Sequence, residues 1–237
     1  EGFGISLVGE MSQDGAISIE YYFPYVKSNR MTEDQNIYVE KFSDKRSYAG
    51  VSNDFSLGMT LIFFITNVAD YAKSLWMNKP SKYFSKAYFA GLSTNGTIIL
   101  DINKEFEQRS SFNNGKRNKL IEAAKKGDPA AIESLTLEDM DTYNLIGKRT
   151  RQEDVLTIVE SSFMPVGIET DHYAVIGNIT ACSEKINSYT GESVYLLDIN
   201  CNDLAFTVAI NKNHLLGEPA PGRRFKGDIW LQGNIVI

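Results

Sequence analysis

The chain has 237 residues, and its 24 Lys and Arg against 30 Asp and Glu give a formal net charge of −6. Hydrophobic residues make up 43% and charged residues 23% of the chain, ordinary proportions that exclude a largely disordered protein. The negative charge opposes bulk attraction to nucleic acid or to anionic lipid.

The N-terminal part, residues 1–102, is predicted to be an α+β domain that opens with a hairpin. Gly4–Glu10 and Ala16–Tyr25 are strand-like runs, and Asp14-Gly15 lies between them. Asp-Gly between apolar runs is a hairpin signal because glycine supplies the positive φ that such turns need. Ile37–Phe42 is predicted to be a third, shorter strand.

A long buried helix is predicted to follow, beginning at Asp54 or Ser56 and ending near Trp76. Apolar residues recur there at spacings of three and four, and the middle of the segment is apolar nearly all round. Such a helix is usually covered on more than one side. A second hairpin is predicted over residues 84–102, with its turn at Asn95-Gly96.

Residues 103–151 predict a polar linker followed by a helical connector. Residues 103–118 are polar and carry several turn-forming residues. Beyond them, Gly127 is a good helix C-terminal residue, and Asp128-Pro129 suits the start of the next helix.

Residues 152–237 predict a β-rich module. The predicted strands are Tyr173–Glu184, Ser193–Asn200, Leu204–Asn211 and Phe225–Ile237. This many strands in so short a segment predicts a small β-barrel or a curled antiparallel sheet. An OB-like barrel is one candidate.

Several segments together resemble one protein family. They are Gly2–Glu10, Tyr22–Tyr25, Ser134–Tyr143, Phe163–Gly167, Ile210–Lys212, Leu215–Pro219, Gly222–Gly227 and Trp230–Gly233. The chain resembles, over nearly its whole length, an uncharacterised bacterial family, a domain of unknown function from Clostridia-type Gram-positive anaerobes. The resemblance implies an intracellular bacterial protein, and we expect a cytoplasmic location. It also leads us to expect an N-terminally trimmed chain, and it implies no reaction or ligand.

Motifs for catalysis, metals and cofactors are not found in the sequence. His172 and His214 are the only histidines, and neither has a Cys or His at ligand spacing, so no metal site is predicted. No nucleophile elbow or phosphate-binding loop occurs, so we predict no catalytic residue and no cofactor. Cys182 and Cys201 are predicted to be buried free thiols. The longest apolar run, Leu57–Ile65, is too short to span a membrane.

The strongest candidate for a binding site is a basic and aromatic segment near the C-terminus. It contains Arg223, Arg224 and Lys226, with Trp230 four residues further on. Cations beside aromatic rings on a small barrel are typical of single-strand binding, in which rings stack on bases. Alternatively, the aromatic residues fill the barrel and the cations protect its edge. The net charge of −1 over residues 172–237 favours the second interpretation, so nucleic acid is a possible but disfavoured partner.

An aromatic cluster in the second strand is a further candidate surface. It consists of Tyr21, Tyr22, Phe23 and Tyr25. Aromatic residues are enriched at protein interfaces, but strand alternation predicts that about half of these rings face the core.

Two functions from different classes remain open. The first is a non-catalytic binding or regulatory protein with an unknown protein or small-molecule partner. The alternative is a hydrolase or transferase with a carboxylate site between the domains, to which Glu160, Glu169 and Asp171 would contribute. Acid–base chemistry needs two carboxylates that both reach the reacting bond.

Overall fold

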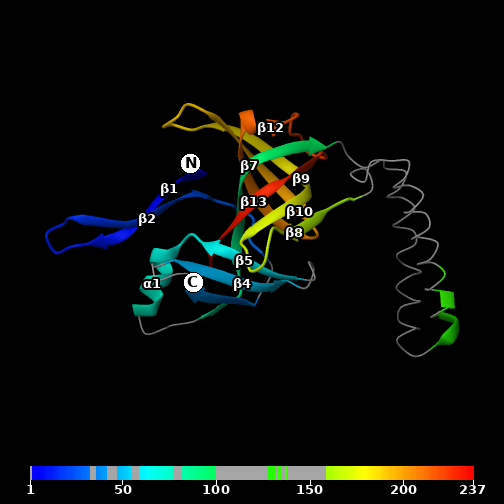
Figure 1. Cartoon of the computed structure of the whole chain (residues 1–237), viewed down its shortest axis with the longest axis horizontal. Helices are drawn as coiled ribbons and strands as arrows, with labels where there is room; N and C mark the ends of the chain where they lie inside the picture. The colour runs from blue at the N-terminus through cyan, green and yellow to red at the C-terminus, as the bar shows by residue number, and fades with distance from the viewer. Residues whose placement is uncertain are drawn as a thin grey trace. The chain divides into compact units, whose positions relative to one another are not determined.

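The computed structural model describes residues 2–32, 36–41, 47–54, 59–76, 82–99, 128–131, 133–134, 137 and 159–237 (Figure 1). The chain divides into two compact units. The main unit joins residues 1–100 to residues 161–237, and residues 101–160 form the other.

Strands make up most of the main unit. In chain order the elements are β1 (Phe3–Met11), β2 (Ile17–Val26), β3 (Ile37–Lys41), β4 (Tyr48–Asp54), β5 (Met59–Ile65), α1 (Val68–Trp76), β6 (Tyr83–Phe84), β7 (Ala87–Ile99), β8 (Ser162–Pro165), β9 (His172–Ile186), β10 (Ser193–Cys201), β11 (Leu204–Asn211), the 3₁₀ turn η2 (Lys212–His214), β12 (Leu215–Leu216) and β13 (Arg224–Ile235).

Five of these strands close into a barrel. β9, β10 and β11 form an antiparallel meander, and β11 pairs in parallel with β7. β13 pairs antiparallel with both β7 and β9, which closes the ring. The inward-facing residues include Phe89, Leu197, Phe206 and Phe225, each 0% exposed, so the barrel encloses a packed apolar core.

The order and directions of these strands are those of an OB barrel with its fifth strand moved to the front of the sequence. In an OB barrel the first three strands form a meander, the third pairs in parallel with the fifth, and the fourth closes onto the first. Here β9, β10, β11, β13 and β7 take the first to fifth positions. The predicted small barrel within residues 152–237 is therefore corrected, because β7 from residues 87–99 is needed to complete it.

The sheet continues beyond the barrel through β13. Its second half pairs in parallel with β5, and β4, β3 and β6 follow in order. Phe63 of β5 lies over two glycines on the neighbouring strands, Gly50 and Gly233, where a Cβ atom would come within 2.4 Å of its ring. Phe63 also meets Phe89 of the barrel edge to face at 4.8 Å. One continuous core therefore joins the barrel to this second part of the sheet.

The predicted long buried helix is wrong. Residues 59–65 form strand β5, and only the short helix α1 follows. Leu61, Phe63 and Ile65 are each 0% exposed and recur with a period of two, the strand period. Dense apolar residues satisfied the helical spacing as well, and the β-branched and aromatic composition of the run favours a strand.

The second predicted hairpin is also wrong, because residues 87–99 form the single strand β7. Asn95-Gly96 lies within β7, where the ladder to β13 shifts register between Gly227 and Ile229. A Cβ on Gly96 would meet the Phe225 ring at 2.4 Å. The glycine therefore serves a close approach between strands rather than a turn.

The α+β class is corrected. The fold is mostly β, and the N-terminal and C-terminal parts, which were predicted to be separate domains, pair directly through β7 and β5. Of residues 103–151, only 128–131, 133–134 and 137 are described, and residues 129–131, 133–134 and 137 are helical. The rest of the predicted linker and connector lies outside the described residues.

Candidate functional site

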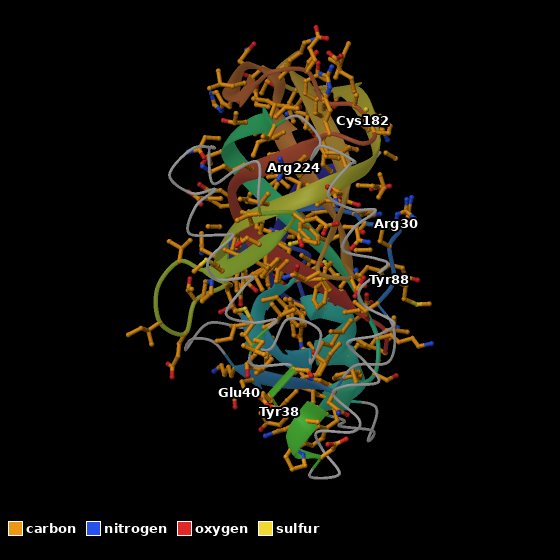
Figure 2. The ribbon with its side chains drawn as sticks, turned by 90° about the vertical axis from the view of Figure 1, so that its right-hand side faces the viewer. Arg30, Tyr38, Glu40, Tyr88, Cys182 and Arg224 are labelled. Atoms are coloured by element: carbon orange, nitrogen blue, oxygen red, sulfur yellow. The ribbon has the colours of Figure 1, made fainter. Side chains whose placement is uncertain are left out.

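The predicted basic segment does not form one exposed patch. Arg224, labelled in Figure 2, is only 1% exposed and has interaction partners. The Arg223 guanidinium donates to the Glu218 carbonyl at 2.6 Å. Lys226 is exposed on β13, and Trp230 is half-buried. Of the four side chains, only that of Lys226 is exposed, and that of Arg224 is buried.

Trp230 instead contacts a residue of the predicted acidic set. Its indole Nε1 donates to Asp171 Oδ2 at 2.7 Å, and Asp171 Oδ1 lies 2.8 Å from His172 Nδ1. The His172 ring stacks on Trp230 at 6.4 Å. Asp171, just before β9, therefore binds the indole of Trp230 through one carboxylate oxygen and the ring of His172 through the other. Glu169 lies in the preceding turn with a positive φ of 48°.

The three carboxylates of the alternative site are not brought together by any contact that the structure records. Glu160 belongs to the second unit, whereas Glu169 and Asp171 belong to the main unit. Among the described residues, no group of three or more His, Cys, Asp or Glu is placed to hold a metal ion.

A groove lies on the outer face of the barrel, in the place where OB barrels take their ligands. That face is formed by β10 and β11, together with the β9–β10 loop. Here a groove of about 560 Å³ runs between this loop and β1, and Leu92, Val194 and Ala209 line its floor. We call it the β1 groove. Lys185 and the loop residues Asn187 to Thr190 form its far side.

The N-terminal hairpin forms the near side of the β1 groove. β1 and β2 pair as a separate two-stranded sheet that extends away from the barrel (Figure 1). At its base, Phe3 and Val26 pack on Leu92, Leu196 and Ala209 of the barrel. Phe23 packs edge to face on Phe64 of β5 at 4.8 Å. The base of the hairpin is therefore held by apolar contacts.

The two edges of the hairpin differ. The Lys27 N–H donates to the Gly2 carbonyl, so by antiparallel alternation the backbone groups of Phe3, Ile5 and Leu7 point away from β2. We call these outward-facing groups the β1 edge. In the part of the chain that the structure describes, β1 pairs with β2 alone.

The β2 edge, by contrast, is closed at the base of the hairpin. Gln232 is 1% exposed, donates from Nε2 to the Pro24 carbonyl at 2.7 Å, and accepts from the Val26 N–H at 3.4 Å. Pro24 itself has no N–H to offer. A proline and a buried amide therefore block strand addition on one side of the hairpin and leave the other side open.

The β1 edge borders two grooves. Gly2 to Ile5 line the β1 groove, and Ile5 to Leu7 line a second groove of about 670 Å³ against Thr66, Asn67 and Tyr88. Ile5 lines both grooves, so open space flanks β1 along its whole first half.

Lys185 lines the β1 groove and Lys27 lines the second groove, and two ion pairs lie outside the residues that line them. Arg30 Nη2 lies 3.2 Å from Asp198 Oδ2, and Lys212 Nζ lies 3.0 Å from Glu184 Oε1. The Lys212 hydrogen bond lowers the pKa of Glu184, and the carboxylate in turn raises the pKa of Lys212. Both pairs are solvent-exposed and contribute little to stability.

Comparison with known proteins identifies the family. The sequence matches, over residues 1–233, a family described as a domain of unknown function, E. rectale gene description (DUF3881). The chain belongs to this family. No match was found among curated proteins or among solved structures. The resemblance noted in the sequence is thus confirmed, and the DUF3881 description assigns no activity.

Two properties of the DUF3881 fold bear on the remaining predictions. Among its described residues, no helix is both long and apolar enough to cross a bilayer. Cys182 and Cys201 are free thiols, and Cys182 is exposed, contrary to the predicted burial of both.

The β1 edge was not predicted as a site. The sequence signal that could have indicated it is Pro24, because a proline removes a backbone donor from β2 and leaves β1 as the strand that can pair with another. Gln232 gives no such signal, because it lies 208 positions from Pro24 and its role depends on the fold.

Proposed function

We propose that this protein is a cytoplasmic, non-catalytic binding protein that takes up an extended segment of a partner polypeptide along β1. Backbone hydrogen bonds to the β1 edge would supply affinity, as in other cases of strand addition. The observation that carries the proposal is the contrast between the closed β2 edge and the open β1 edge beside two grooves.

The grooves favour an extended peptide because alternate side chains of an added strand point to opposite faces. Side chains on one face would reach the apolar floor at Leu92, Val194 and Ala209. The other face would meet the second groove or solvent. Nucleic acid is less favoured, because Phe3 and Val26 cover the barrel surface on which bases would stack.

A cytoplasmic location is supported by composition. Two free thiols, one of them exposed, are compatible with a reducing compartment. No observation favours the alternative carboxylate enzyme, since the recorded contacts of Asp171 serve to hold Trp230 and His172.

Replacing Ile5 by Pro tests strand addition directly. Ile5 lies opposite Pro24 at a position whose N–H points away from β2, so proline removes a donor of the β1 edge and leaves the β1–β2 pairing intact. Peptides selected from a displayed random library on the wild-type protein should bind Ile5→Pro about tenfold more weakly, for the loss of one hydrogen bond and strand fit. Fluorescence anisotropy measures the affinity.

Ile5→Val is the matched control, since it keeps the N–H and a β-branched side chain. It should retain the affinity of the wild type. Failure to select any peptide, or equal affinities for Ile5→Pro and wild type, would refute the proposed function.

A further inference from the structure

The distal part of the hairpin carries an exposed apolar surface. Six large residues there are between 53% and 75% exposed: Ile5, Leu7, Met11, Ile17, Ile19 and Tyr22. We call this set the hairpin face. Exposed apolar residues scattered singly need no explanation, but a contiguous set of this size marks an interaction surface.

A β-bulge places all six on one side of the hairpin. Leu7 pairs with Tyr22, but Gly9 pairs with Ile19, so Glu20 is the extra residue. Directly opposite residues share a face. The bulge therefore turns Ile17 and Ile19 away from the side of Tyr21 and towards the side of Leu7.

Gly9 makes this bulge possible. A Cβ atom there would lie 2.1 Å from the Ser18 carbonyl oxygen and 2.9 Å from the Ile19 Cα. Only glycine fits so close to the partner strand. The sequence thus maintains an arrangement that gathers the apolar side chains on one exposed face.

Two acidic residues of the hairpin lie off this face. Glu10 pairs with Ser18 on the opposite side, and Asp14 lies in the turn. Glu20 is the extra residue of the bulge. Residues 1–26 contain no Lys or Arg, so neither anionic lipid nor a phosphate backbone is attracted to them. A face composed of large apolar side chains is typical of permanent homodimer interfaces, whereas transient interfaces are more polar.

The size of the face also fits a dimer. With the exposed fractions above, the six side chains present roughly 700 Å² of accessible surface, close to the ~800 Å² that each partner buries in a standard interface. An isolated two-stranded hairpin is only marginally stable in water and gains stability when another layer packs on it. A second copy is present whenever the chain is, so it can always supply such a layer to the distal part of the hairpin.

We propose that a second copy of this chain packs on the hairpin face, hairpin against hairpin, about a twofold axis. In each copy Glu10 and Asp14 lie away from this contact. Such a contact is isologous and closes at two copies. The dimer uses side chains of the hairpin face, whereas the proposed function uses the outward-facing backbone groups of β1, so the inference goes beyond that function although both surfaces include Ile5 and Leu7.

Threonine substitutions on the face test the dimer. Ile17→Thr with Ile19→Thr keeps β-branched side chains and strand propensity but removes apolar surface from both copies. Neither residue lines a groove. Sedimentation velocity over a range of concentrations should show a wild-type dimer of twice 26.5 kDa. Dimerisation of the double variant should be at least ~100-fold weaker.

Ser18→Thr is the control, because it introduces the same side chain on the opposite side of the same strand. It should remain dimeric, and circular dichroism should show that all three proteins are folded. A wild-type protein that stays monomeric at high concentration would overturn the proposal, whether or not it sediments with lipid vesicles. So would a dimer that the double variant leaves unchanged. Peptide affinity at the β1 edge is measured separately, so either proposal can fail alone.

Discussion

Single residues decide which surfaces of this molecule are open. Gln232 satisfies the outward-facing groups of Pro24 and Val26 with the two ends of one amide. Removing such a buried partner costs about 1–3 kcal/mol for each group left unpaired. Arg224 is similarly buried, so a change at this residue is expected to disturb the fold rather than a binding surface alone.

The two cysteines should differ sharply in reactivity. Cys201 is 0% exposed and donates to the Ile176 carbonyl at 3.2 Å, and burial raises the pKa of its thiol to about 12. A thiol reagent at mildly alkaline pH should therefore modify Cys182 alone in the native protein, and both thiols after denaturation. Native Cys182→Ser should not react at all.

The raised pKa of Cys201 also makes the free energy of unfolding depend on pH in a definite direction. Because the folded pKa of Cys201 is raised, its contribution to stability is present below the unfolded thiol pKa of about 8.5 and is lost as pH rises towards 12. Rapid labelling of Cys201 at neutral pH would show that it is not buried as described.

At the scale of elements, short strands are set by pairing as much as by their own pattern. The run from Met59 to Ile65 supports both helical and strand spacing, and its pairing with β4 and β13 selects the strand. Asn95-Gly96 has the composition of a turn but lies inside β7. In both places a strand forms where the sequence predicts a helix or a turn, because neighbouring strands satisfy the backbone N–H and C=O groups along its length.

The bulge in the hairpin is the element most open to test. Gly9→Ala forces a Cβ atom into the Ser18 carbonyl, so we expect the pairing beyond Val8 to be lost and the hairpin face to be broken up. Hydrogen exchange should rise several-fold or more in residues 9–11 and 17–20 and remain unchanged in the barrel. Exposed Ser18→Ala is the control, and protection equal to wild type in Gly9→Ala would show that the bulge is not required.

At the scale of the whole molecule, the barrel depends on a strand from the first half of the chain. β7 pairs with both β11 and β13 and contributes Ala87 and Phe89, which are both 0% exposed. Without it, two strands lose a partner and the core loses a large aromatic side chain, itself worth about 3–5 kcal/mol.

A fragment that contains only residues 152–237 should therefore not fold. It would keep four strands of the barrel but neither β7 nor β5. We expect poor amide dispersion in its NMR spectrum and no cooperative thermal transition. The full chain should instead show well-dispersed amide signals and a cooperative transition. A cooperative melt of the fragment would show that four strands are sufficient.

The sequence by itself determined the local features. Asp14-Gly15 predicted the first hairpin correctly, and the runs after residue 172 predicted β9, β10, β11 and β13 with small differences in their bounds. The family segments also predicted the DUF3881 membership. These signals succeed because turn chemistry and strand alternation act over a few residues.

Only the tertiary structure decided the rest. The closure of the barrel by β7, the burial of Arg224 and the sealing of β2 by Gln232 all join residues far apart in sequence. Which distant strands pair depends on how their side chains fill a shared core, after the entropy of closing long loops has been overcome. The closed part of the β2 edge, against which the β1 edge is recognised, also follows from that long-range packing, because Gln232 supplies it from the other end of the chain.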